Sequence, residues 1–127
     1  MTIWDRSQGR RRVISRVAQP PREPFAVEDL ASGDEHTLVL IGELDVAAAE
    51  DLEAAIIPCA NAAALTLDLS HLSFMDSTGL TVILLADALC KARGIVFAVV
   101  PGPRQVQRTF EIAGLLEQLP FETEPTR

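Results

Sequence analysis

The chain has 127 residues, 48% of them hydrophobic, and its 18 acidic and 11 basic residues give a formal net charge of −7. This length fits one domain with a substantial apolar core that needs neither disulfides nor a metal ion. The acidic balance excludes a general nucleic-acid-binding protein, whose surface would be basic. The two cysteines, Cys59 and Cys90, lie in apolar or alanine-rich segments, as in a protein of the reducing cytoplasm.

The charge divides the chain into two regions. Residues 1–24 carry six arginines against two acidic residues, a net charge of +4, whereas residues 25–127 carry five basic and sixteen acidic residues, a net charge of −11. The first region has no sustained apolar pattern and ends in a proline-rich stretch, so we predict a disordered basic arm over residues 1–24. We expect no secretory signal and no membrane span. One domain is expected over residues 25–121, followed by a C-terminal tail over residues 122–127.

The first predicted elements are a hairpin and a helix. Residues 25–31 alternate loosely, residues 32–34 have turn chemistry, and residues 37–41 form the second strand. Asp45 then precedes a helix over residues 46–60, in which apolar side chains recur at helical spacing. Its carboxylate suits the N-cap position of that helix.

Two strands flank the next helix. Residues 65–69 alternate with three leucines on one face, and residues 95–100 are continuously apolar, which predicts a central strand. The helix between them is predicted over residues 78–93 and ends at Gly94. Because it is apolar on most sides, we expect it to be largely buried.

A third helix, over residues 104–113, and a short edge segment at residues 119–121 complete the domain. The order β-β-α-β-α-β-α predicts a single α/β domain, with a mixed sheet of four to five strands and helices packed against it. The core is predicted to contain Leu38, Leu40, Leu52, Ile56, Leu67, Leu69, Ile83, Leu84, Phe97, Val99 and Phe110.

The candidate site lies where strands end. Residues 42–45, 73–79 and 101–103 follow three strands, and in open α/β sheets ligands and partners gather at this edge. Helix N-termini, with free N–H groups, meet there as well. The loop over residues 73–79 is the polar one and contains Asp76, Ser77 and Thr78.

Enzymatic functions lack their motifs in this sequence. A hydrolase nucleophile elbow requires glycine two positions before the serine, and Met75 stands there before Ser77. The two histidines, His36 and His71, and the two cysteines show no metal-ligand spacing, and the glycines form no phosphate-binding loop. We therefore expect no catalytic residue and no metal.

Ser77 itself has two interpretations. At the start of a helix, its hydroxyl suits a structural N-cap that accepts an N–H two or three residues later. The same position also suits modification, because a phosphate adds about −1.5 to −2 charge beside free helix N–H groups. Asp76 and Asp45 would oppose that charge, so phosphorylation would change the local surface potential sharply.

Three stretches together carry a family resemblance. They are Gly42-Glu43-Leu44-Asp45, the strand over residues 65–70, and Phe-Met-Asp-Ser-Thr-Gly-Leu over residues 74–80. At these distances from one another they resemble the STAS domain and, more narrowly, the bacterial anti-sigma factor antagonists. The resemblance covers residues 25–121 and explains nothing about the basic arm.

The resemblance implies a cytoplasmic antagonist that, unphosphorylated, binds an anti-sigma factor and frees a sigma factor for transcription. The anti-sigma factor is usually a serine-protein kinase that brings its own ATP, so no cofactor is implied for this chain. Phosphorylation of the serine matching Ser77 breaks the complex, and a phosphatase resets it. No direct contact with nucleic acid or membrane is implied, and a monomer or weak dimer is expected.

Carried over residue by residue, the resemblance makes Ser77 the phosphoacceptor and Asp76 the adjoining acid. Asp45 matches an acidic position near the same surface, and Thr78 and Gly79 open the helix and let a partner approach. Two alternatives stay open. One is a STAS ligand-binding or scaffold module in a stress-signalling assembly, not regulated by phosphorylation. The other is a hydrolase that uses Ser77.

Overall fold

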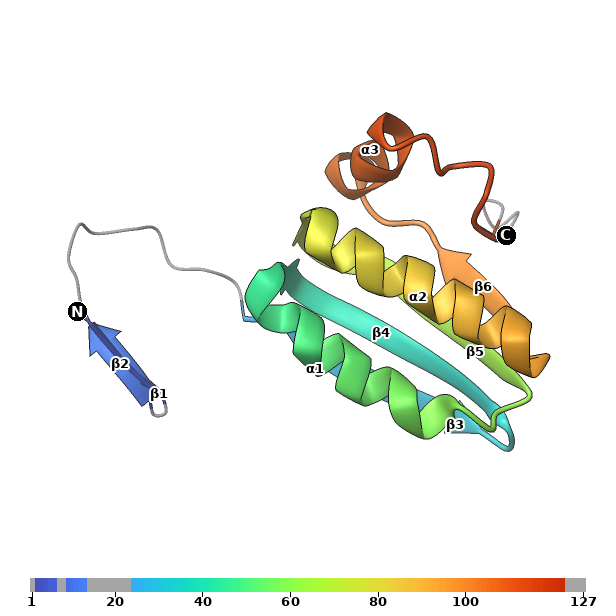
Figure 1. Cartoon of the computed structure of the whole chain (residues 1–127), viewed down its shortest axis with the longest axis horizontal. Helices are drawn as coiled ribbons and strands as arrows, with labels where there is room; N and C mark the ends of the chain where they lie inside the picture. The colour runs from blue at the N-terminus through green and yellow to red at the C-terminus, as the bar shows by residue number, and fades with distance from the viewer. Residues whose placement is uncertain (1, 7–8, 14–23, 123–127) are drawn as a thin grey trace.

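The computed structural model of the chain describes residues 2–6, 9–13 and 24–122. Over residues 24–122 the elements follow the predicted order β-β-α-β-α-β-α (Figure 1). They are β3 (Ala26–Ser32), β4 (Glu35–Leu44), α1 (Val46–Ile56) with the 3-10 turn η1 (Ile57–Cys59), β5 (Ala64–Met75), α2 (Ser77–Arg93), β6 (Val96–Val100) and α3 (Arg104–Ile112). Within the described residues, no helix has both the length and the apolar character that a bilayer span requires.

Two further strands lie in the basic arm. Strands β1 (Thr2–Arg6) and β2 (Gly9–Val13) pair antiparallel in a two-stranded sheet of their own. The sequence shows no strand pattern in this region, so the pairing was not predicted. Residues 1, 7–8, 14–23 and 123–127 lie outside the described residues, and disorder of the arm over residues 1–24 stays a prediction.

The main sheet is mixed, as predicted. Its strand order is β3-β4-β5-β6, with β3 antiparallel to β4 and the other neighbours parallel. A single bridge between Val99 and Phe121 adds the predicted short edge segment. Helices α1 and α2 lie side by side over one face of the sheet, and α3 lies toward the end at which β5 and β6 finish (Figure 1). The α/β architecture is therefore confirmed.

The position of β6 corrects the prediction of a central strand. Strand β6 ends the sheet order, and Val96 is 69% exposed. In place of a further strand, the C-terminal segment pairs with part of this edge. The N–H of Val99 donates to the Pro120 carbonyl at 3.0 Å, and the N–H of Glu122 donates to the Val99 carbonyl at 2.8 Å.

Strand β5 is longer than predicted. Its parallel pairing with β4 continues to Leu44 and Met75, so Asp76 alone separates β5 from α2, where a loop over residues 73–79 was expected. The ladder is irregular between Val39 and Ile41, and the adjacent Ser70 and His71 on β5 are both exposed. Because the alternation of buried and exposed side chains is interrupted here, the period-2 pattern did not predict the second half of the strand.

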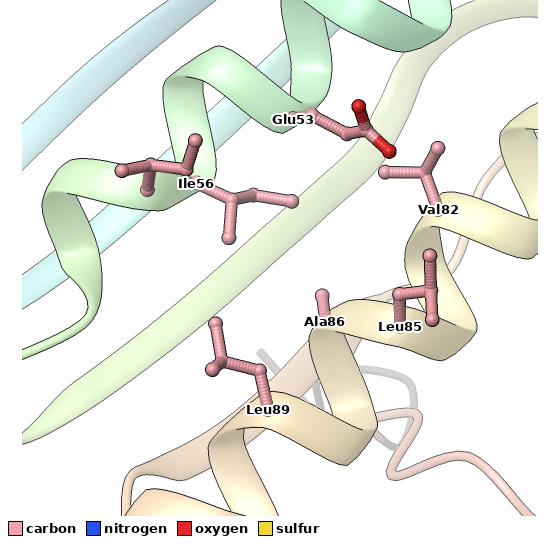
Figure 2. A pocket seen from close by; sticks show the side chains of 7 residues that line it. Glu53, Ile56, Val82, Leu85, Ala86 and Leu89 are labelled. Carbon is pink, nitrogen blue, oxygen red and sulfur yellow. The ribbon is translucent and has the colours of Figure 1, made fainter.

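The core lies between the sheet and the helices. Nine of the eleven predicted core side chains are buried, and Leu84 and Phe97 are partly buried. Helix α2 is less buried than its composition suggests, because Leu85 is 56% exposed. The side of α2 that faces α1 and the end of α1 form an apolar groove, with Ile56, Val82 and Leu89 among its lining residues (Figure 2).

Candidate functional site

Two helix starts are tied together at one edge of the sheet. Strand β4 leads through Asp45 into α1, and the neighbouring parallel strand β5 leads through Asp76 into α2. The backbone N–H of Asp76 donates to the carbonyl of Leu44 at 3.2 Å, which joins the two junctions. The sheet edge predicted from the sequence is therefore formed, with both acidic residues on it.

Asp45 is the N-cap of α1, as predicted. Its Oδ1 accepts a hydrogen bond from the N–H of Ala48 at 3.1 Å. The residue is only 8% exposed. Asp45 thus places a buried carboxylate at the positive end of the α1 dipole, where negative charge is stabilised.

The N-cap of α2 is Asp76, so the N-cap interpretation of Ser77 is wrong. Asp76 Oδ1 accepts from the N–H of Thr78 at 2.9 Å and from the N–H of Gly79 at 3.3 Å. Ser77 is the first residue of the helix, and its side chain is exposed. Because Asp76 supplies the capping acceptor, the hydroxyl of Ser77 does not cap α2.

Removing the cap gives a direct test of this assignment. Asp76→Ala is expected to lower the free energy of unfolding by about 1 kcal/mol, since two N–H groups lose their acceptor. Asp76→Asn should restore most of that loss, because asparagine is an equally good N-cap. The matched control Ser77→Ala should stay within about 0.5 kcal/mol of wild type in urea denaturation. Equal losses in Asp76→Ala and Ser77→Ala would return the capping role to Ser77.

Gly79 is buried in the first turn of α2. A Cβ atom at this position would lie 2.6 Å from Leu44 Cγ and 3.0 Å from Met75 Cγ. The absence of a side chain therefore lets α2 pack directly onto the ends of β4 and β5. In this structure Gly79 permits a close approach between α2 and the strands of the same chain. Thr78, beside it, is half-buried.

Comparison with known proteins shows which family this chain resembles in sequence. Residues 30–126 match the STAS domain. The chain belongs to the STAS domain family. No protein with a curated description matches this STAS domain in sequence.

Solved structures share the fold of this STAS domain. An anti-sigma factor antagonist from Mycobacterium paratuberculosis superposes with a TM-score of 0.72 and 23% identity, over 80% of this chain and 87% of that chain. The anti-sigma factor antagonist SpoIIAA in its unphosphorylated form gives a TM-score of 0.65 and 25% identity, over 80% and 90% of the two chains. The Bacillus cell fate determinant SpoIIAA in the phosphorylated form superposes with a TM-score of 0.61 and 24% identity, over 80% of this chain and 93% of that chain.

Helix α3 supports the segment that leads to Ser77 in this STAS domain. Gln105 Nε2 donates to the Ser73 carbonyl at 2.9 Å, and Thr109 Oγ1 donates to the Met75 carbonyl at 3.4 Å. Sequence reasoning missed both residues, since 32 and 34 positions separate the partners. A polar side chain on the first two turns of α3 is the signal that could have suggested them.

The surface around the two helix starts combines acidic and apolar groups. Val46, the first residue of α1, is 69% exposed, and Phe74, which pairs with Glu43 across the sheet, is 43% exposed. A shallow hollow beside the start of α1 is lined in part by Glu43, Asp45 and Asp51. Exposed apolar side chains give a partner protein contact area, and the acids set the sign of the local potential.

Proposed function

We propose that this STAS domain is an anti-sigma factor antagonist that is switched off by phosphorylation at Ser77. In its unphosphorylated form it binds an anti-sigma factor with serine-kinase activity, which frees a sigma factor for transcription. The observation that carries the proposal is the exposed Ser77 at the first position of α2, beside a cap that Asp76 supplies. Support also comes from SpoIIAA, which is known in both an unphosphorylated and a phosphorylated form.

The switch acts through electrostatics at a fixed surface. Because Ser77 is exposed, a phosphate can be added without repacking the core. The phosphate brings about −1.5 to −2 charge, which the N-terminal dipole of α2 stabilises. The same charge adds to the acidic groups of Asp45 and Asp76, so a partner surface fitted to the unphosphorylated state meets repulsion and a desolvation cost.

The proposed residues divide into direct and indirect roles. Ser77 is the phosphoacceptor, and the exposed Val46 and Phe74 offer apolar contact to the partner. Asp45, Asp76, Thr78 and Gly79 act by holding the two helix starts in place. The partner kinase brings the ATP and a phosphatase removes the phosphate, both in the cytoplasm, where free thiols such as those of Cys59 and Cys90 stay reduced.

The phosphorylation site can be tested with purified proteins. Incubation with the cognate anti-sigma kinase and ATP is expected to add one phosphate to the wild-type chain and none to Ser77→Ala, as measured by intact-mass spectrometry. The matched control is Thr81→Ala, which removes an exposed hydroxyl one turn further along the same helix and should leave phosphorylation unchanged. If Ser77→Ala accepts phosphate as well as the wild type, the site assignment is wrong.

A further inference from the structure

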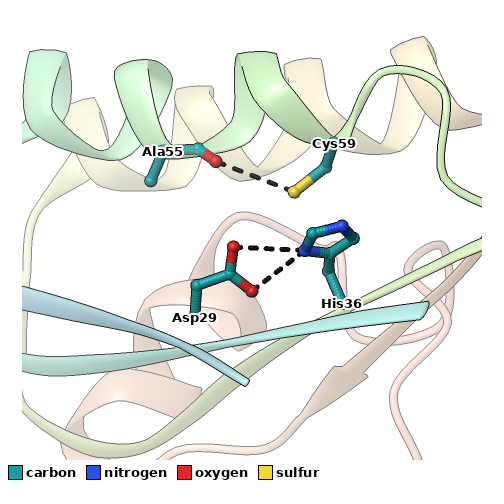
Figure 3. Close-up of polar contacts among 4 residues, drawn as sticks. All are labelled: Asp29, His36, Ala55 and Cys59. Atoms are coloured by element: carbon teal, nitrogen blue, oxygen red, sulfur yellow. Dashed lines mark hydrogen bonds and ion pairs between the residues drawn. The ribbon is translucent and has the colours of Figure 1, made fainter. Parts of the chain in front are cut away.

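Three side chains of metal-ligating type meet at the opposite end of strand β4 from Ser77. They are Asp29 of β3, His36 near the start of β4, and Cys59 of η1 (Figure 3). One potential ligand atom from each lies within 4.8 Å of the others. The spacing of His36 and Cys59 along the sequence did not indicate this cluster, because its members lie on three separate elements.

Strand register brings two of the three together. Asp29 lies opposite Leu38 and His36 lies opposite Ala31, so Asp29 and His36 are diagonal neighbours on one face of the β3–β4 ladder. This is the face of the buried Leu38, which packs under the helices. His36 Nδ1 lies 2.9 Å from Asp29 Oδ1 and 3.1 Å from Oδ2.

The end of α1 supplies the third side chain. The chain leaves α1 through η1, and the Cys59 sulfur points down from there toward the His36 ring and the Asp29 carboxylate (Figure 3). Cys59 Sγ donates a weak hydrogen bond to the Ala55 carbonyl at 3.7 Å. Sulfur, imidazole nitrogen and carboxylate oxygen therefore face one another between the helix layer and the sheet.

We propose that Asp29, His36 and Cys59 bind a Zn²⁺-like divalent transition-metal ion, with water in a fourth position. Zn²⁺ takes thiolate, imidazole and carboxylate ligands at about 2.0–2.3 Å. The three ligand atoms already lie within 4.8 Å of one another, close to the separation of atoms that share one such ion. One carboxylate, one thiolate and a neutral imidazole also balance the charge of the ion.

The cluster is open on one side and closed on the other. The Asp29 side chain is 45% exposed and that of His36 is 23% exposed, which gives an ion a path from solvent and leaves room for a water ligand. Cys59 is only 1% exposed. A buried sulfur with an accessible carboxylate and imidazole holds an ion at the rim of the core.

Proton balance follows from the state of the thiol. Burial, together with the negative charge of Asp29, raises the pKa of the Cys59 thiol, so it is protonated when no metal is bound. Metal binding releases that proton to solvent, and the ion takes its place beside the sulfur. The imidazole stays neutral by moving its proton from Nδ1 to Nε2, so the hydrogen bond between His36 Nδ1 and Asp29 is replaced by one bond from each residue to the ion.

Cobalt gives a probe that reports on the sulfur directly. Titration of the reduced full-length chain with Co²⁺ is expected to produce a thiolate-to-cobalt charge-transfer band that saturates at one equivalent and disappears when Zn²⁺ is added. Cys59→Ser should abolish the band. His36→Asn and Asp29→Asn should weaken Co²⁺ binding by at least about 10-fold. Loss of a residue that merely orients a metal ligand already lowers metal affinity by about that much.

Two matched variants control for adventitious binding. Cys90→Ser removes the other buried thiol and His71→Asn removes the other histidine, and both should keep the band and the affinity. A wild-type chain without the band overturns the proposal, as does a band that survives Cys59→Ser in a folded protein. Loss of Co²⁺ binding in Cys90→Ser or His71→Asn that matches the loss in His36→Asn overturns it too.

Thermal stability keeps the proposal testable if Cys59→Ser does not fold. An ion that binds only the folded state raises the melting temperature by mass action. Zn²⁺ should therefore raise the melting temperature of the wild type and of His71→Asn by the same amount, and that of His36→Asn by less. An equal rise in all three means an adventitious ion only and overturns the proposal.

Discussion

Ser77→Asp is expected to weaken binding to the anti-sigma factor by about 1–3 kcal/mol, roughly 5- to 150-fold in Kd. The substitution places a fixed negative charge at the exposed first residue of α2, next to the carboxylate of Asp76. The α2 dipole stabilises that charge in the free chain, so the loss falls on the complex. Isothermal titration of the partner into wild type and variant measures it.

Size and charge can be separated by two controls. Ser77→Asn has the shape of the aspartate without its charge and should bind several-fold more tightly than Ser77→Asp. Thr81→Asp places the same charge one turn further along α2, on another exposed residue, and should cost less. The difference between Ser77→Asp and Ser77→Asn should shrink at high salt. Unchanged affinity in Ser77→Asp removes the switch and favours a STAS ligand-binding or scaffold module.

The order of elements could be predicted because each has a local cause. Asp45 at an N-cap and Gly94, which ends α2 at a φ of 71°, set helix limits in the structure as they do in the sequence. The place of β6 could not be predicted in this way. A continuous apolar run indicates that the faces of a strand are covered, and it does not indicate whether the strand has a neighbour on each side. Strand β6 has β5 on one side, and the segment around Pro120 pairs with part of the other.

The location of the candidate site could be predicted from the sequence, whereas the role of each residue in it could be predicted only in part. Parallel strands bring their carboxyl ends together, which placed Asp45 and Asp76 at one edge. The N-cap of α2 was predicted at Ser77 and lies at Asp76, because both residue types cap well and a one-residue shift of the helix start exchanges them. The length of β5 decides it, through the pairing that continues to Met75.

The cluster of Asp29, His36 and Cys59 could not be predicted from the sequence, for a different reason. Its members come from a strand, the next strand and the end of a helix. Only the hairpin register and the path of η1 over the sheet bring them together. Short-range spacing rules detect metal ligands on one helix or one loop, so they do not detect a cluster assembled from three elements.

Phe110→Ala is expected to lower the free energy of unfolding by about 3–5 kcal/mol. The Phe110 side chain is fully buried, and its ring meets that of Phe121 edge to face, with centroids 5.0 Å apart and planes at 81°. Truncation leaves a cavity between α3 and the sheet and removes the anchor of the C-terminal segment. Because folded domains are stable by only about 5–15 kcal/mol, urea denaturation should show a large shift of the midpoint.

Ile112→Ala on the same helix is the matched control, because Ile112 is 76% exposed and should cost less than about 0.5 kcal/mol. A double-mutant cycle with Phe121→Ala should give a coupling of about 0.5–1.5 kcal/mol for the aromatic pair. Helix α3 also donates hydrogen bonds to the carbonyls of Ser73 and Met75. Loss of Phe110 should therefore speed amide hydrogen exchange at the end of β5, just before Ser77, more than at its start. Uniform exchange along β5 would show that α3 does not hold the segment that presents Ser77.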